Sequence, residues 1–178
     1  AALPLNIQCT FFDVSTDCPS AALGTVISSK TENGLQDFIA SADVFSLEFE
    51  NTPLSDVDVL TKQKDMHPPR QALAIAQHRL SEKALFDELE IPVAPYKAVD
   101  SLESLSAAVA ELGLPIVLKT ATGGYDGKGQ SKIKNEQEYR NFLSTAFKSG
   151  EEEYLIEEQI HFDMEVSVII TRFQDGNS

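Results

Sequence analysis

The sequence predicts an α/β protein in two parts: a doubly wound parallel sheet at the N-terminus and a small α+β unit after it. Short strand-like runs alternate with a helical stretch over residues 7–47, an order typical of parallel sheets with crossover connections. From residue 115 onward the order becomes strand, glycine-rich loop, strand, helix, strand and strand. We place the boundary between the two domains between residues 78 and 79.

The first domain is expected to contain three short strands and one helix. Residues 7–14 read as the first strand, residues 25–27 as the second and residues 44–47 as the third. Between the last two, residues 35–42 place their apolar side chains on one face at helical spacing. Together they predict strands that run parallel and are joined by a helical crossover.

The junction between the two domains is expected to be helical. A long helix should run from Arg70 to about Glu90 and end before Ile91-Pro92, because proline disfavours helical backbone at the preceding residue. Asp100 is expected to cap the next helix, with Glu103 as its capping-box partner. That helix should end at Gly113, a typical C-terminal glycine.

The second domain is expected to form around a glycine-rich loop. Asn135 should cap a helix, with Glu138 at its third position. The expected strands cover residues 115–119, 130–133, 153–158 and 165–171.

Composition narrows the classes of partner. The chain has 14 Lys and Arg against 28 Asp and Glu, and its net charge of −14 argues against nucleic acid and anionic membranes. No apolar run approaches the roughly 20 residues of a bilayer-spanning helix. Cys9 and Cys18 fit neither a metal pattern nor a disulfide framework, so we expect reduced thiols in a cytoplasmic protein. His67, His78 and His161 lack metal-ligand spacing, and we predict no metal ligands within this chain.

Residues 115–130 carry the strongest functional signal. A buried-strand run ends in Lys119 and meets a loop with four glycines in residues 123–129. Glycine suits backbone that adopts positive φ or passes close to a ligand, and a concave row of N–H groups beside lysines suits a polyphosphate. The Walker and dinucleotide motifs do not fit, because Thr122 and Lys132 stand where those motifs need glycine. We therefore expect another kind of lid over a triphosphate, with Lys119 near the α- and β-phosphates.

Other charged residues are weaker candidates. Lys132 and Lys134 are interpreted as solvated lysines at a strand edge. Residues 153–160 pair an apolar strand with acidic groups, a pattern that fits either an adenine-reading hinge or a solvated acidic run. Glu165, on the next expected strand, could accept hydrogen bonds from a ribose. Residues 48–51 follow a predicted parallel strand, where open α/β sheets place ligand groups.

These segments resemble the N5-carboxyaminoimidazole ribonucleotide synthetases, a family of ATP-grasp ligases. Gly123–Gln130 is similar to the lid loop of the family, and Phe45–Asn51 to its strand ending in Glu-Phe-Glu-Asn. Arg79–Phe86 and Ile91–Tyr96 look like its entry into the ATP-grasp fold, and Glu157–Ser167 like its hinge and ribose-binding strand. The resemblance extends along essentially the whole chain.

The resemblance implies a pre-ATP-grasp domain over residues 1–78, lacking its first strand, and an ATP-grasp domain over residues 79–178. The second domain would contain the lid subdomain and the start of the central sheet, with the C-terminal part of the fold absent. The implied reaction joins bicarbonate to 5-aminoimidazole ribonucleotide with ATP and Mg²⁺, through carboxyphosphate, in a homodimer. Because the catalytic and metal-binding residues of the family would lie beyond Ser178, we expect the isolated chain to be inactive.

Carried over by position, the resemblance also implies two groups of site residues. Candidates for the substrate side are Glu48, Glu50, Asn51 and Tyr125. The implied ATP-binding residues are Arg79, Lys119, Gly124, Tyr125, Asp126, Gly127, Lys128, Gly129, Gln130, Glu157, Glu158, Gln159, Ile160 and Glu165.

Two alternatives stay open. The first is another ATP-grasp ligase, of the biotin carboxylase or ribonucleotide transformylase type, although residues 48–51 and the Tyr125-Asp126 pair disfavour it. The second is a non-catalytic ATP-binding module that kept the lid. Ala121 and His78 also depart from the family, which commonly has a basic residue and an aspartate at these positions.

Overall fold

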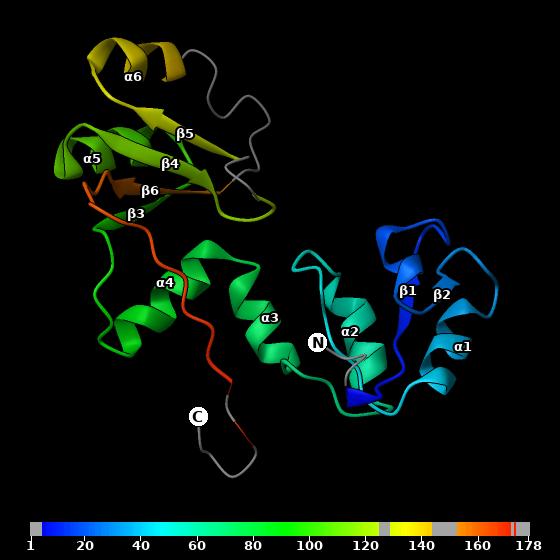
Figure 1. Cartoon of the computed structure of the whole chain (residues 1–178). Coiled ribbons are helices and arrows are strands. Elements are labelled where there is room, and N and C mark those ends of the chain that lie inside the picture. The colour runs from blue at the N-terminus through cyan, green and yellow to red at the C-terminus, as the bar shows by residue number, and fades with distance from the viewer. Residues whose placement is uncertain (1–4, 125–128, 144–152, 172, 174–178) are drawn as a thin grey trace. The chain divides into compact units, whose positions relative to one another are not determined.

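The structure, a computed structural model, describes residues 5–124, 129–143, 153–171 and 173. The chain divides into two compact units, Ala1–Leu85 and Phe86–Ser178. Figure 1 labels the helices and strands of both units. Within the described ranges, no helix is both long enough and apolar enough to cross a membrane.

The N-terminal unit contains a short parallel sheet. Strands β1 (Thr10–Asp13) and β2 (Thr25–Ser28) pair in parallel, with Thr10 opposite Thr25. The 3₁₀ helix η2 (Pro19–Ala22) lies between them in the chain, and α1 (Gly34–Ser41) packs against both strands. The predicted parallel pairing of the first two strands is confirmed, and so is a helix over most of residues 35–42.

The third strand expected in this unit is much shorter than predicted. Phe45 forms an isolated parallel bridge with Met66: its N–H donates to the Asp65 carbonyl at 2.9 Å, and its carbonyl accepts from the His67 N–H at 3.0 Å. A strand needs hydrogen-bonded neighbours along its length, and over residues 44–47 the structure shows ladder pairing at Phe45 alone. The Phe38 ring of α1 lies 5.3 Å from that of Phe45 and fixes the segment by packing.

The long helix expected from residue 70 is interrupted. Helix α3 (Arg70–Ala76) ends before Gln77, and α4 (Arg79–Glu88) begins two residues later. The Gln77 amide donates to the carbonyls of Glu50 at 2.7 Å and Thr52 at 2.6 Å, so a tertiary contact holds the chain at the break. Helix α2 (Leu54–Thr61) was not expected. The buried core residues of this unit are Phe45, Val57, Leu60, Met66 and Leu73.

The C-terminal unit is a four-stranded antiparallel sheet in the order β3-β6-β4-β5. Two helices cover one face of it: α5 (Leu102–Leu112) and α6 (Glu136–Leu143). The strands are β3 (Tyr96–Val99), β4 (Ile116–Thr120), β5 (Gln130–Ile133) and β6 (Tyr154–Glu158). The buried core lies between this face and the helices and comprises Val99, Leu105, Ala108, Val109, Ile116, Leu118, Ile133 and Ile156.

The helix ends test the predicted caps. Glu138 N–H donates to the Asn135 side chain at 3.0 Å, which confirms the cap of α6. Gly113 follows α5 with φ of 75°, as expected of a terminal glycine. The N-terminal cap of α5 was predicted wrongly: Ser101 rather than Asp100 is the cap, because its hydroxyl accepts from the Ser104 N–H at 3.1 Å.

Two further predictions differ from the structure. Strand β3 was not expected. In contrast, residues 165–171 form no strand, and the apolar side chains of this segment are exposed, Ile169 to 93%. The segment is rich in β-branched residues, as strands are, but no strand in the described part of the chain pairs with it.

Candidate functional site

The sheet of the C-terminal unit has a polar face opposite its helices, which we call the site face. Directly opposed residues of antiparallel strands project to the same side. Val117 of β4 is opposite both Lys132 of β5 and Glu157 of β6, and Lys119 is opposite Gln130. The strand register therefore brings all four polar side chains to the site face.

A cavity of about 420 Å³ opens at the site face. The cavity is lined by residues of three strands, by the segment that follows β6 and by Ala94. Its lining residues are Ala94, Val117, Lys119, Gln130, Lys132, Glu157, Glu158, Gln159, Ile160, His161, Phe162 and Glu165. Seven of the sequence-predicted ATP-binding residues thus lie around one cavity.

An ion pair lies at the centre of this cavity. The Lys119 ammonium donates to the Glu157 carboxylate, with side chains 26% and 9% exposed. Among the described residues, Glu157 is the one charged side chain in the buried class. Burial of a carboxylate is costly unless a cation or hydrogen bonds accompany it. Lys119 therefore both compensates Glu157 and presents a positive charge to the cavity.

Both described ends of the glycine-rich loop need glycine. Gly123 has φ of 74° and Gly129 φ of 72°, in the left-handed region that other residues rarely adopt. The Gly129 carbonyl accepts from the Thr120 N–H at 2.8 Å, so the loop leaves and rejoins the sheet at neighbouring positions. Tyr125, Asp126, Gly127 and Lys128 lie outside the described residues.

The expected hinge continues from β6 along the cavity. Glu158 N–H donates to the Pro95 carbonyl at 2.9 Å, and Gln159 N–H to the Pro115 carbonyl at 3.2 Å. These bonds fix the backbone at the point where the hinge was predicted. The Gln159 side-chain oxygen is buried and accepts no hydrogen bond from the residues that the structure describes.

The remaining predicted residues lie elsewhere in the fold. Arg79 begins α4 and is partly buried. Glu48, Glu50 and Asn51 are exposed in the loop after Phe45, within the N-terminal unit. Ala121, which departs from the family pattern, is only 3% exposed, and its N–H donates to the Glu153 carbonyl at 2.8 Å.

Sequence reasoning missed several residues of the cavity. Lys132 is exposed on the edge strand β5, as expected of a solvated lysine, and it also lines the cavity together with Lys119. Aligning residues 130–133 against 116–119 as an antiparallel pair would have placed Lys132 and Lys119 on one face, since Lys132 is opposite Val117, which lies two residues from Lys119 on the same strand. No comparable signal marks Ala94, His161 or Phe162.

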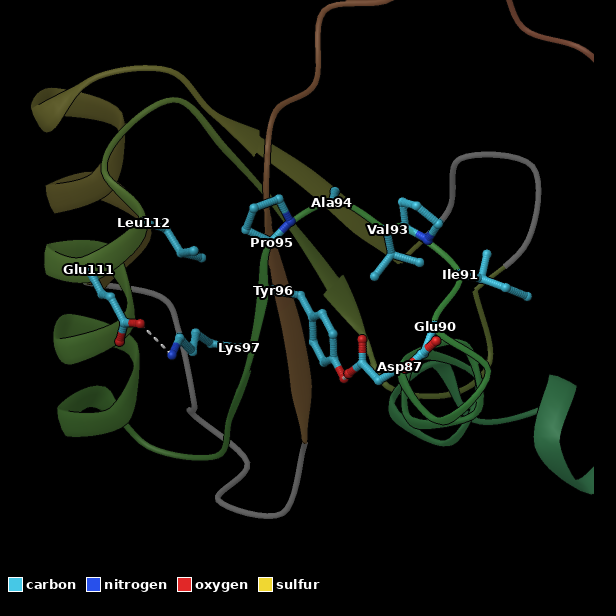
Figure 2. A pocket seen from close by; sticks show the side chains of 11 residues that line it. Asp87, Glu90, Ile91, Val93, Ala94, Pro95, Tyr96, Lys97, Glu111 and Leu112 are labelled. Atoms are coloured by element: carbon cyan, nitrogen blue, oxygen red, sulfur yellow. Dashed lines mark hydrogen bonds and ion pairs between the residues drawn. The ribbon is translucent and has the colours of Figure 1, made fainter.

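A second cavity of the same unit, about 510 Å³, is a weaker candidate. Figure 2 shows two separate polar pairs at this cavity, Lys97 with Glu111 and Tyr96 with Asp87. Lys97 forms an ion pair with Glu111 at 2.5 Å, and the Tyr96 hydroxyl donates to Asp87 at 2.6 Å. The hydrogen bond to Asp87 raises the pKa of Tyr96. Among the described residues, Lys97 is the one lysine or arginine that lines this second cavity, whereas Lys119 and Lys132 both line the site-face cavity, which favours the site-face cavity as the place for an anion.

Comparison with known proteins identifies the family to which the chain belongs. Residues 84–178, more than half of the chain, match the ATP-grasp domain family. The chain belongs to the ATP-grasp family. Residues 1–77 match the ribonucleotide synthetase preATP-grasp domain. The predicted fold, with a pre-ATP-grasp domain followed by an ATP-grasp domain, is therefore confirmed.

Individual relatives of this ATP-grasp chain are N5-carboxyaminoimidazole ribonucleotide synthases. That of Vibrio cholerae is 35% identical over 97% of this chain and 46% of its own length. That of Pseudomonas aeruginosa is 33% identical over all of this chain and 49% of its own. The structure of the Staphylococcus aureus N5-carboxyaminoimidazole synthetase complexed with ADP superposes with a TM-score of 0.79 at 28% identity, over 89% of this chain and 43% of that one. The resemblance seen in the sequence is confirmed, and the chain spans about half the length of these relatives.

Proposed function

We propose that this chain supplies the ATP-binding part of a ligase that carboxylates 5-aminoimidazole ribonucleotide to N5-carboxyaminoimidazole ribonucleotide. In this proposal residues 1–78 form the pre-ATP-grasp domain and residues 79–178 the first part of the ATP-grasp domain. The observation that carries the proposal is the shared cavity of Lys119, Gln130, Glu157–Ile160 and Glu165. The named relatives give the reaction class.

The cavity suits ATP in its chemistry. Lys119 offers an ammonium for a phosphate oxygen. The buried Gln159 oxygen can accept a hydrogen bond, and the amino group of adenine is a donor that would supply one. Val117 and Ile160 add apolar surface for a planar base. We assign Lys119 to the phosphates, the Glu157–Ile160 backbone with Gln159 to adenine, and Glu165 to the ribose hydroxyls.

ATP would activate bicarbonate as carboxyphosphate, and the exocyclic amine of the ribonucleotide would then capture the carboxyl group, leaving ADP and phosphate. We assign Mg²⁺ to the phosphates of the nucleotide, whose charge it would neutralise. In the described part of the chain, no group of three or more His, Cys, Asp and Glu side chains could hold a metal ion. This chain's part in the reaction is to bind and orient the nucleotide.

The test is a turnover assay on the gene product that contains this sequence. With 5-aminoimidazole ribonucleotide, bicarbonate and MgATP, we expect ADP release that depends on both co-substrates. Lys119→Gln should reduce turnover at least tenfold. Release that instead depends on biotin, or on formate with a different ribonucleotide, would contradict the proposal and indicate another ATP-grasp ligase.

A further inference from the structure

A turn of the N-terminal unit carries three polar side chains next to a parallel pairing. Phe45 forms a parallel bridge with Met66, and Glu48, Glu50 and Asn51 follow it closely in the chain. The segment after a parallel strand is where open α/β sheets place the groups that contact a ligand. All three side chains are exposed and therefore accessible to a ligand.

A side chain from another element holds this turn by its backbone. Gln77, which follows α3, donates its amide to the carbonyl of Glu50 at 2.7 Å and to that of Thr52 at 2.6 Å. Asn51 lies between these two carbonyls in the chain. The turn also closes on itself, because the Thr52 hydroxyl donates to the Phe49 carbonyl at 2.8 Å. The backbone is thus fixed on both sides of Asn51.

The chemistry of this contact explains the choice of residue. Backbone carbonyls only accept hydrogen bonds, so a group that binds two of them must supply at least two hydrogens. The side-chain amide of Gln77 supplies two without introducing a charge into a half-buried position. The two carbonyls lie 27 and 25 residues away in the sequence. The contact is therefore tertiary, and it fixes the turn against the end of a helix.

We propose that Gln77 is a positioning residue that fixes Glu50 and Asn51 for contact with the ribonucleotide substrate. The proposal rests on the proposed function, which supplies the ribonucleotide. Ribose hydroxyls can donate to carboxylate and amide oxygens, and such bonds weaken steeply when distance or angle is wrong. A turn that is fixed before binding also avoids the entropic cost of ordering it. Gln77 acts through the backbone of the turn and does not itself contact the substrate.

Steady-state kinetics of the gene product that contains this sequence test the proposal. Gln77→Met, uncharged and of similar length, removes both hydrogen bonds. It should raise the KM for 5-aminoimidazole ribonucleotide about tenfold or more and change the KM for MgATP less than about twofold.

Two further variants complete this experiment. Gln77→Lys should return the ribonucleotide KM to near the wild-type value, because an ammonium can donate to two carbonyls, as Lys64 does to those of Ile39 and Ala42. Gln71→Met is the matched control: it changes an exposed glutamine of the same helix and should leave both KM values unchanged.

A second arm needs no substrate and uses the 178-residue chain. Cleavage by a glutamate-specific protease after Glu50 requires local opening of the turn, so Gln77→Met should accelerate it about fivefold or more, and Gln77→Lys should not. Cleavage after Glu32, an exposed residue of the same unit, is the internal control and should not change. Gln77→Glu also lacks the donor and has nearly the same shape as glutamine, so it replaces Gln77→Met in both arms if that variant does not fold.

Three results would overturn the inference. One is a ribonucleotide KM that does not rise in Gln77→Met, that rises equally with the KM for MgATP, or that Gln77→Lys does not restore; loss of folding in both donor-less variants counts with it, since Gln77 would then be structural only. Another is equal cleavage after Glu50 with and without the Gln77 amide. The third is a wild-type gene product that does not turn over the ribonucleotide, which would overturn the proposed function as well; in the first two results wild-type turnover is intact and only the positioning role fails.

Discussion

Lys119 of β4 and Glu157 of β6 form an ion pair diagonally across two neighbouring antiparallel strands, at the centre of the site-face cavity. Their residues are 38 positions apart in the sequence, and the register of the sheet brings them together. The pair links stability and ligand binding, since the cation that compensates Glu157 is also the one proposed to meet the phosphates.

The ion pair should contribute to the stability of the C-terminal unit. Lys119→Gln and Glu157→Gln are each expected to lower the unfolding free energy by about 1–2 kcal/mol, because each removes a charge-assisted hydrogen bond at a largely buried site. The double variant should lose less than the sum of the two. The chain has four tyrosines, all after residue 85, and no tryptophan, so tyrosine fluorescence during urea unfolding reports on this unit. Strict additivity of the two losses would contradict the coupling.

The glycine-rich loop can be tested by comparing two glycines with similar φ angles, Gly129 in the loop and Gly113 outside it. Gly129→Ala and Gly113→Ala should each cost about 1 kcal/mol of stability because φ is positive at both positions. A Cβ at Gly129 would also lie 2.7 Å from the Thr120 hydroxyl oxygen, whereas one at Gly113 meets nothing within 4 Å. We therefore expect Gly129→Ala alone to weaken MgATP binding in calorimetry. Equal MgATP affinities of the two variants would contradict a role of the loop in nucleotide binding.

The Tyr96–Asp87 hydrogen bond predicts a dependence of stability on alkaline pH. The pKa of Tyr96 is raised in the folded protein because its hydroxyl donates to Asp87. The stabilisation is therefore fully present below the pKa of an unfolded tyrosine, near 10, and is lost as the pH rises through the higher folded value. Tyr96→Phe should cost about 0.5 kcal/mol at pH 8, because the contact is exposed. Urea unfolding should show a smaller difference in unfolding free energy between wild type and Tyr96→Phe at pH 11 than at pH 8. An equal difference at the two pH values would contradict this interpretation.

The cap of α5 predicts unequal effects of two neighbouring substitutions. Ser101→Ala should destabilise the C-terminal unit by about 1 kcal/mol, because it removes the acceptor of the Ser104 N–H. Asp100→Ala removes only an exposed acceptor of the Ser104 hydroxyl and should cost less than half as much. Urea unfolding compares the two; a larger cost at Asp100 would favour the cap expected from sequence.

Elements defined by local signals were predicted well. β5 covers the predicted residues 130–133, and the Asn135–Glu138 cap was identified because both partners lie within one helical turn. Asp100 and Ser101 are adjacent residues that both favour caps, so local sequence could not decide between them. Strand β3 is four residues long and is defined by its pairing with β6, which no short window contains.

The site was predicted in its residues but not in its arrangement. The glycine pattern and the family resemblance indicated Lys119 and Glu157 separately, and the ion pair between them depends on a strand register that the sequence pattern does not state. Lys132 is exposed as expected, but its place at the same cavity depends on this register too. Residues 165–171 show the converse, because their β-branched composition is typical of a strand although no neighbouring strand pairs with them in the described residues.

The most direct test of the central claim is calorimetric titration of the 178-residue chain with MgATP and with MgGTP, in the wild type and in Lys119→Gln. An ATP site at the site-face cavity predicts saturable MgATP binding and a loss of about tenfold or more in MgATP affinity on removal of the lysine. It also predicts weaker binding of MgGTP, because guanine has a carbonyl where adenine has the C6 amino group proposed to meet Gln159. No binding of MgATP, equal affinities for the two nucleotides, or an affinity that does not depend on Lys119 would contradict it.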